Sequence, residues 1–438
     1  MNDKTNKENL IISSTRYEYT VVVINWFIVG FVALDRLLIA NLFPWVIPAL
    51  KIDYTKAGLV MAILSVTWSV SALVFGGISD KIGRRIIISS ATLIFSLLSW
   101  MSGLVTSFAQ LLGIRAVMGV AEGAYYPTAI ATVAEESKPE RRAMNVGLCL
   151  SAFNMIGMVL CPIYATTVAT VWGWRMAIYL TAIPGIILAL LSWRMLHEPA
   201  STATRRQAKK EGRIEAEIES GESKGWSHIF TYRNILLGAL VAIFCMGWSL
   251  TFLTFGMTFL MHVNQLAPQA AGLTMAMLGV GGAIGSFLIP YFSDQYGRKP
   301  AMIVAGILTA IATFSLVFWA VSPWSMSLCV FLMGMFGYGL FPIITGAVPF
   351  ESVPINLTAS AVGVIIFVSE IIGGAGASAL GGMVADAYGL NFTIVIGGIC
   401  ALLAAACSFG LKETAPKVLA RRGAAGGAKP GAAGTSVN

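Results

Sequence analysis

Charged residues are scarce in this chain, and their scarcity excludes an ordinary soluble protein. Only 11% of the 438 residues are charged and 57% are hydrophobic, whereas about a quarter of the residues in a soluble globular domain are charged. The mean hydropathy is +0.78. The composition therefore indicates a polytopic membrane protein.

The chain also has few residues of the kinds that hold metals or carry out catalysis. Its three histidines are scattered and lack ligand spacing, so we expect no metal site. Its six cysteines fall within apolar stretches without Cys-x-x-Cys spacing, which predicts buried free thiols. No nucleophile or cofactor motif stands out. We therefore expect that the protein is not an enzyme and uses no cofactor.

Long apolar stretches are what the sequence has in abundance. Each is at least about 18 residues long, which is enough for a helix to cross the bilayer. They predict an all-α polytopic membrane protein with twelve transmembrane helices. The stretches are approximately 20–43, 55–78, 85–106, 109–134, 143–167, 175–196, 234–261, 268–292, 300–321, 323–349, 357–384 and 388–411.

Lysine and arginine are distributed unevenly among the predicted loops. The side shared by both ends of the chain carries most of them, and the opposite side has only Lys51, Lys56 and Arg175. By the positive-inside rule, both termini are expected in the cytoplasm. The polar stretch 1–16 precedes no small-residue cleavage site, so the first helix is expected to be retained. We expect a multi-pass protein of the plasma membrane, in bacteria the inner membrane.

A polar segment separates two groups of six predicted helices. We expect an N-terminal six-helix bundle at 1–197, a cytoplasmic linker at 198–232 and a C-terminal six-helix bundle at 233–412. The segment 413–438 is rich in glycine and alanine, which predicts a disordered cytoplasmic tail.

The two halves share a motif at an offset of about 214–216 residues. Ser-Asp-Lys-Ile-Gly-Arg-Arg at 79–85 recurs as Ser-Asp-Gln-Tyr-Gly-Arg-Lys at 293–299. Such self-similarity indicates a duplicated fold, and related halves fit a transporter that rocks one half against the other. The run Gly-x-x-x-Asp-Lys-x-Gly-Arg-Arg at 76–85 resembles the signature of the major facilitator superfamily. With the twelve predicted helices, the resemblance covers roughly residues 16–415.

This motif is expected to act as a conformational latch. Its aspartate and basic residues can pair across the cytoplasmic ends of neighbouring helices, and its glycines allow close backbone approach. If the basic residues only set orientation, the aspartate and glycines would not be needed at fixed spacing. In the second half Pro290 and Gln295 replace a glycine and a basic residue, which predicts a weaker latch. The expected gating residues are Gly76, Asp80, Gly83, Arg84, Arg142, Asp294 and Arg298.

Four charged residues interrupt the apolar stretches of the first half. Asp35 and Arg36 are adjacent in the first predicted helix, and Arg115 and Glu122 lie seven residues apart in the fourth. Ionisable residues at the membrane centre are costly and mark substrate or proton paths. Two helical turns place Arg115 and Glu122 on one face, roughly 10 Å apart and too distant to pair.

These charges have no counterparts in the second half. Under the repeat, Arg115 falls on Val330 and Glu122 on Gly337. Charges required only by the shared fold would be expected in both halves, so their restriction to one favours binding or coupling. The alternative is a buried network whose charges neutralise one another.

Two further residues are expected near the site. Glu370 interrupts the eleventh predicted helix and aligns with the neutral Asn154. It is either a contact to a polar group of the substrate or a protonated structural carboxyl. Tyr126 of the fourth helix either lines the cavity or packs in the core.

The Asp-Arg pair at 35–36, with Arg-x-x-x-Gly-x-x-Glu-Gly at 115–123, resembles the anion:cation symporter family of this superfamily. The resemblance implies that Arg36 binds the substrate carboxylate and that two carboxyls carry protons. The stretch 121–142 also resembles aromatic-acid:proton symporters, so sugar acids, aromatic acids and small organic acids all stay open. The expected substrate-binding residues are Arg36, Arg115, Tyr126 and Glu370, and the expected proton-coupling residues are Asp35 and Glu122.

The chemistry of these residues supports the same reading. A guanidinium presents a planar fork that suits a carboxylate, and a buried carboxyl can take up and release a proton. We therefore expect a monomeric secondary active transporter in the lipid bilayer that takes up an organic anion with protons, by alternating access, without a nucleic-acid partner. The alternative is a proton-coupled antiporter that expels drugs or cations, although Arg36 and Arg115 argue against it.

Overall fold

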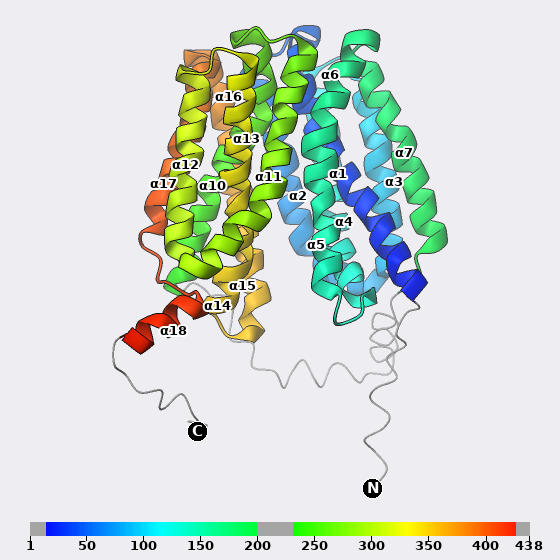
Figure 1. The fold of residues 1–438 in the computed structure, drawn as a ribbon. Helices are drawn as coiled ribbons and strands as arrows, with labels where there is room; N and C mark the ends of the chain where they lie inside the picture. The colour runs from blue at the N-terminus through cyan, green and yellow to red at the C-terminus, as the bar shows by residue number, and fades with distance from the viewer. Residues whose placement is uncertain (1–14, 199–230, 426–438) are drawn as a thin grey trace.

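The computed structural model describes residues 15–198 and 231–425, and every regular element in these ranges is helical (Figure 1). The helices before the central gap are α1 Thr15–Leu50, α2 Tyr54–Ile82, α3 Arg84–Ser102, α4 Phe108–Glu136, α5 Arg142–Ala152, the π-helical η1 Phe153–Leu160, α6 Cys161–Trp172 and α7 Trp174–Met195.

The second series begins after the gap and contains three further π-helical segments. It comprises α10 Arg233–Thr258, η3 Phe259–Val263, α11 Pro268–Tyr296, α12 Arg298–Phe318, α13 Pro323–Gly339, η4 Ile343–Ala347, α14 Val348–Ser352, α15 Ile355–Val368, η5 Ser369–Ala375, α16 Gly376–Tyr388, α17 Leu390–Ser408 and α18 Pro416–Ala425.

Eleven helical segments in the described ranges are long and apolar enough to cross a membrane. Four of them contain a π-helical segment, namely 142–172, 233–263, 323–352 and 360–388. The helix α4 is 29 residues long but is not one of the eleven. Its interior carries Arg115 and Glu122, which lower its mean hydropathy.

The predicted tail is wrong for residues 416–425, because they form the helix α18. Alanine, leucine, lysine and arginine are good helix formers, and Pro416 suits the first position of a helix. The Arg421 guanidinium reaches the main-chain oxygen of Gln295, so α18 lies beside the end of α11. The rest of the predicted tail and residues 199–230 of the predicted linker fall outside the described residues.

The sequence repeat of the two halves has a structural counterpart in the sharp turns that follow α2 and α11. Gly83 ends α2 with φ of 119°, and Gly297 ends α11 with φ of 115°. Glycine adopts such φ angles at little cost in free energy, whereas other residues are strained there. The matched glycines explain why the chain turns directly into α3 and α12 at equivalent points.

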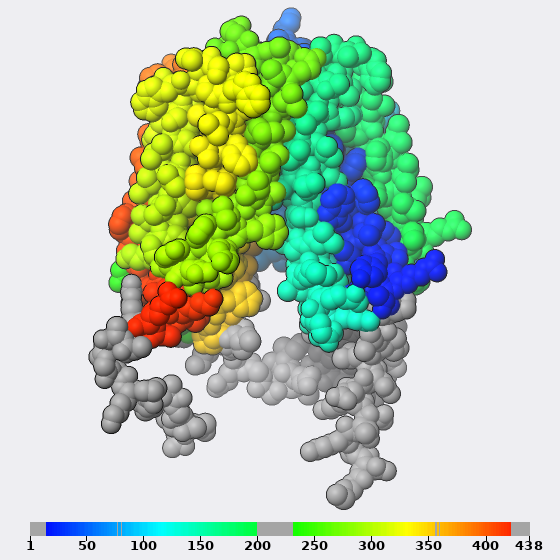
Figure 2. Space-filling model, viewed as in Figure 1, coloured from blue at the N-terminus to red at the C-terminus, as the bar shows by residue number. Residues whose placement is uncertain are grey.

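The helices gather on two sides of the molecule, with α1–α7 on one and α10–α17 on the other (Figure 1). The sides meet where α11 contacts η1 and α6, where α2 contacts α16 and η5, and where α1 contacts α10. Figure 2 shows that the sides separate toward the end of the molecule where α1 begins and where α18 lies. The opposite end is closed.

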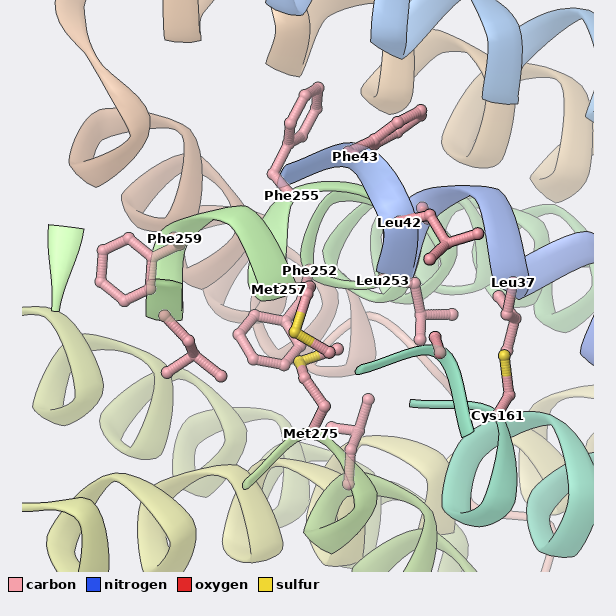
Figure 3. Packing of buried hydrophobic residues seen from close by; sticks show 14 of the residues in the cluster. Leu37, Leu42, Phe43, Cys161, Phe252, Leu253, Phe255, Met257, Phe259 and Met275 are labelled. Carbon is pink, nitrogen blue, oxygen red and sulfur yellow. The ribbon is translucent and has the colours of Figure 1, made fainter. Parts of the chain in front are cut away.

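An apolar cluster joins the two sides toward the closed end. Figure 3 shows side chains of α1, α6, α10, η3 and α11 that pack together there. Labelled members are Leu37, Leu42, Phe43, Cys161, Phe252, Leu253, Phe255, Met257, Phe259 and Met275. Asp35 and Arg36 precede the labelled α1 members Leu37, Leu42 and Phe43 in the chain, so they lie on the side of these residues that faces the separated end.

Candidate functional site

The four intramembrane charges expected at the site are all buried. The exposed fractions are 1% for Asp35, 8% for Arg36, 2% for Arg115 and 0% for Glu122. None of the four therefore faces lipid. A buried charge requires compensation by hydrogen bonds or an opposite charge, so the partners of each residue decide what it can do.

Arg36 bridges the two sides of the molecule. Its Nη2 atom forms an ion pair with Oε1 of Glu370 in η5 and donates a hydrogen bond of 3.0 Å to Oγ of Ser65 in α2. The guanidinium carbon also lies 5.5 Å from the centroid of the Trp68 ring, within cation–π range. Neither the ion pair nor the two α2 contacts was expected from the sequence.

Glu370 lies in a π-helical segment and is 3% exposed. π-helical segments inside α-helices are frequent at functional sites. Its sequence counterpart Asn154 lies in η1, which is also π-helical. Neither of the two roles expected for Glu370 included an ion pair with Arg36.

Asp35 points away from Arg36, as adjacent positions on a helix require. Ser99 Oγ of α3 donates to Asp35 Oδ1 at 2.8 Å, and this hydroxyl lies 3.4 Å from Thr181 Oγ1. The second carboxylate oxygen, Oδ2, is buried without a hydrogen-bond partner among the described residues. Asp35 therefore faces α3 and α7, whereas Arg36 faces α2 and η5.

Arg115 is held against α1. Its Nη1 donates to the main-chain oxygen of Asp35 at 3.0 Å, and its Nε has no partner among the described residues. No ion pair to Glu122 is found within the described ranges, in agreement with the expected spacing. Arg115 therefore binds the α1 backbone at Asp35 and has no hydrogen bond to Arg36 or Glu370 among the described residues.

Glu122 is the most isolated of the four. Both carboxylate oxygens are buried and lack a hydrogen-bond partner among the described residues. Its charged neighbours are Arg36, Asp35 and Arg115. The carboxyl therefore interacts electrostatically with both arginines, without a hydrogen bond or ion pair to either among the described residues.

Aromatic side chains surround Arg36 on both sides of the molecule. The Tyr126 ring of α4 lies 5.5 Å from Trp68, and the Tyr338 ring of α13 lies 5.6 Å from Trp248. Both tyrosines are electrostatic neighbours of Arg36. Ser249 lies 2.5 Å from the Tyr338 hydroxyl and fixes its position. Tyr126 is half-buried near the site, which fits a lining position.

The first copy of the repeated motif contains ion pairs with glutamates that the sequence did not single out. Arg84 pairs with Glu135 at the end of α4. The main-chain N–H groups of Arg84 and Arg85 donate to the two oxygens of Glu198, at 2.8 and 3.3 Å. Glu198 thus satisfies the first N–H groups of α3, which have no partner within the helix.

The second copy repeats this arrangement. Arg298 pairs with Asp294 at 2.5 Å and with Glu351 at 2.7 Å. Its main-chain N–H donates to Glu413 at 2.7 Å, as that of Arg84 does to Glu198. The residues Glu135 and Glu198 therefore have counterparts in Glu351 and Glu413.

For three of the expected gating residues, the described part of the structure does not contain the expected contact. A Cβ at Gly76 would meet open space, so the expected close approach is absent there in this conformation. Arg142 is exposed and has no ion pair among the described residues, while the neighbouring Arg141 pairs with Glu18 at 2.9 Å. The side chain of Asp80 lies outside the described part of the structure, so its pairing stays a prediction.

An apolar groove of about 820 Å³ lies elsewhere, between α1, α6 and α7. Its lining includes Phe27, Phe31, Tyr164 and Pro184 and contains no charged residue. It is therefore separate from the charged site.

Comparison with known proteins identifies the family. The model of the Major Facilitator Superfamily matches residues 26–377. The chain belongs to this family. It is thus a membrane transporter and not an enzyme. Among its relatives, the hexuronate transporter of Bacillus subtilis (strain 168) is 26% identical and the match covers 67% of this chain and 70% of that protein.

Two further comparisons cover similar or greater lengths. The gallate transporter of Pseudomonas putida is 24% identical, and the match covers 66% of this chain and 68% of that protein. A crystal structure of a bacterial homologue of the human lysosomal transporter Spinster, inward-facing and occupied, superposes with a TM-score of 0.77. It is 17% identical and covers 90% of this chain and 97% of that chain, which supports the fold alone.

Proposed function

We propose that this transporter takes up an organic carboxylate together with protons, by alternating access. The observation that carries the proposal is a buried arginine, Arg36, at the junction of the two sides, with one of its bonds to a carboxylate already formed. A guanidinium binds a carboxylate through two parallel hydrogen bonds, which gives both affinity and orientation. The substrates named for the hexuronate and gallate transporters are carboxylates, which agrees with this chemistry.

The surroundings of Arg36 suit the rest of such a substrate. Trp68 and Tyr126 offer ring faces on one side of the molecule, and Tyr338 offers another on the opposite side. Aromatic rings pack against an apolar or aromatic body, and tyrosine hydroxyls bind its polar groups. In this proposal the substrate lies between the two sides and contacts both.

Asp35 and Glu122 are proposed as proton carriers. An ionised carboxylate that is buried without a full set of hydrogen bonds costs a large free energy. Three of the four carboxylate oxygens of Asp35 and Glu122 are buried without a hydrogen-bond partner among the described residues. Protonation removes the charge, and the nearby arginines stabilise the ionised form when the proton leaves. Both groups can therefore cycle between the two forms during transport.

The membrane arrangement follows from the same proposal. We infer that α4 is the twelfth spanning helix and that its two interior charges are tolerated because they face protein. Two six-helix bundles, at 1–197 and 233–412, would then rock about the site, joined by the 198–232 linker and followed by a cytoplasmic tail from 413. Both termini would be cytoplasmic, so the separated end in Figure 2 would face the cytoplasm. The transporter is proposed to work as a monomer.

Transport into proteoliposomes tests the proposal. Radiolabelled glucuronate, gallate and benzoate are supplied outside, with or without an acidic external pH. At least one should accumulate above its external concentration only with the pH gradient, and a protonophore should abolish accumulation. Liposomes without protein are the control. Failure of every carboxylate, with expulsion of a lipophilic cation instead, would favour the efflux alternative.

A further inference from the structure

We propose that Glu370 is a built-in competitor of the substrate carboxylate, which holds Arg36 while the site is empty and releases it on taking up a proton. This inference rests on the proposed function, because it assumes that Arg36 receives the substrate. It assigns Glu370 a role different from that of a substrate contact or a structural carboxyl.

Glu370 occupies an atom of Arg36 that a bidentate carboxylate would also need. A guanidinium can bind a carboxylate with two parallel hydrogen bonds through Nη1 and Nη2 or through Nε and Nη2. Both arrangements require Nη2, and Nη2 is the atom that Glu370 Oε1 contacts. No hydrogen bond to Nε or Nη1 of Arg36 is found among the described residues. Nη2 has two N–H bonds, and its acceptors are Glu370 Oε1 and Ser65 Oγ. A substrate carboxylate therefore cannot bind bidentately without displacing Glu370 or Ser65, and displacing Ser65 alone would leave two carboxylates on one guanidinium.

The charge of Glu370 opposes the arrival of a second carboxylate at Arg36. Two ionised carboxylates around one arginine repel each other, and the repulsion is strong in a site that excludes water. Glu370 is 3% exposed, so it cannot turn into bulk water. The backbone beneath it is also constrained, because a Cβ at Gly373 would lie 2.2 Å from the main-chain oxygen of Ile243. Proton uptake is the remaining way for Glu370 to release Arg36.

The proton balance is simple. A proton from water on the open side bonds to a carboxylate oxygen of Glu370, and the ion pair with Arg36 is replaced by the pair between Arg36 and the substrate. The site carries the same net charge before and after, because one anion and one proton have entered together. When the substrate leaves, Glu370 loses the proton and binds Arg36 again.

Other ionisable groups around the pair do not provide an equivalent partner. Those that act on Arg36 are Glu122 and Tyr126 of α4 and Tyr338 of α13. The elements packed against η5 are α2, α10, α15 and α16, and their charged residues lie near helix ends. Glu370 is thus the carboxylate in direct contact with Arg36 within the described ranges.

The pair also explains how an empty carrier can return. Arg36 belongs to the first half and Glu370 to the second, 334 positions later in the chain. In the empty site each neutralises the other, so neither charge is left alone while the halves move. Loss of the glutamate charge should therefore slow return of the empty carrier but leave exchange of substrate intact.

Binding measurements on the purified full-length protein test the inference. Affinity for glucuronate, gallate and benzoate is measured at pH 6 and pH 8 for wild type, Glu370→Gln and Glu370→Asp. Wild type should bind more weakly at pH 8 than at pH 6. Glu370→Gln should bind about tenfold more tightly than wild type at pH 8. Its affinity should depend less on pH than that of wild type, because only Asp35 and Glu122 still take up protons. Glu370→Asp, which keeps the charge but has a shorter reach, should lie between wild type and Glu370→Gln, and it serves if Glu370→Gln does not fold.

The outcomes separate this inference from the proposed function. Weaker or unchanged binding by Glu370→Gln, with normal binding by wild type, would overturn the competitor role and leave the carboxylate transporter standing. If wild type binds none of the three carboxylates but Glu370→Gln does, the competitor role is supported. If neither protein binds any of them at either pH, both proposals fail.

Discussion

Asp386 of α16 accepts two hydrogen bonds from Thr55 at the start of α2, one from the main-chain N–H at 2.8 Å and one from the hydroxyl at 2.6 Å. Its other oxygen accepts from the Tyr54 N–H at 3.0 Å. A carboxylate at a helix N-terminus satisfies free N–H groups and interacts favourably with the helix dipole. Here the carboxylate and the helix belong to opposite sides of the molecule.

Asp386→Asn should therefore weaken the closed end. Loss of the charge at the start of α2 should cost about 1 kcal/mol, or roughly a fivefold shift toward separation of the closed end. Distances between spin labels placed on either side of that end would measure the shift. The matched control is Asp53→Asn, because Asp53 caps α2 from its own side by accepting the Lys56 N–H at 2.7 Å. Equal shifts from both variants would refute the role of the cross-contact.

Arg36→Lys should reduce carboxylate affinity severely. An ammonium cannot reproduce the planar fork, and the expected loss is about 2 kcal/mol, or roughly 30-fold in dissociation constant. Binding of the carboxylate that wild type transports would measure it. Arg115→Lys is the control, because its contact to the Asp35 main-chain oxygen is a single bond that a lysine can also form. Unchanged affinity in a folded Arg36→Lys protein would remove Arg36 from the binding site.

The helices and the charged helix faces could be predicted from the sequence, because each depends on local composition. Eleven of the twelve predicted apolar runs correspond to helical segments that are long and apolar enough to span a membrane. The divergence of Asp35 from Arg36 follows from helix geometry. Contacts between distant segments could not be predicted. Glu370 meets Arg36 across 334 positions, and its place depends on a π-helical turn that leaves no clear mark in the sequence.

The sequence repeat also carries information about the glutamate partners of the two latch arginines. Asp294 and Arg298 indicate the second copy of the latch, but the motif itself does not include the glutamates that complete both copies. Glu351 follows Arg298 by 53 positions, and Glu135 follows Arg84 by 51. Under the repeat Glu351 aligns with the second residue of the adjacent pair Glu135–Glu136, so the sequence limits the partner of Arg84 to this pair without deciding between its two members. Such matching works because duplicated halves keep equivalent contacts.

Asp35→Asn and Glu122→Gln should each lower the accumulation that a proton gradient supports. Each neutral side chain removes one proton from the transport cycle, so the same gradient drives the substrate less far above its external concentration. At least one variant should retain exchange of labelled for unlabelled substrate, because exchange requires no net proton release. Ser99→Ala is the control, since it removes a hydrogen bond to Asp35 but leaves both carboxyls in place. Normal accumulation by both neutral variants would place the proton carriers elsewhere.

Within the second latch, Glu351→Gln should disturb transport more than Asp294→Asn. The Glu351 side chain is 17% exposed and that of Asp294 is 52% exposed. Exposed ion pairs contribute little, about 0–1 kcal/mol. Glu351 also accepts a hydrogen bond of 2.6 Å from Thr414 Oγ1, so its loss frees two partners. Turnover rates and thermal unfolding of the two variants would decide, and a larger effect from Asp294→Asn would contradict the ranking.

The first latch is predicted to be the stronger of the two. Asp80→Asn should therefore shift the balance between conformations more than Asp294→Asn, with little change in substrate affinity. Distances between spin labels on the loops at the separated end would report the shift. Equal shifts from the two variants would refute the asymmetry.

Charge movement distinguishes the number of protons carried by Asp35 and Glu122. If each brings one proton beside the one that Glu370 takes up, three protons accompany a monovalent anion such as benzoate. Two net positive charges then enter per cycle, each worth about 2.3 kcal/mol per 100 mV. Benzoate should produce a sustained inward current on a solid-supported membrane, and Glu122→Gln, with one proton fewer, should produce about half the current per benzoate transported. Uptake by wild type without steady charge movement would mean that a single proton accompanies each anion, so that neither Asp35 nor Glu122 cycles its proton.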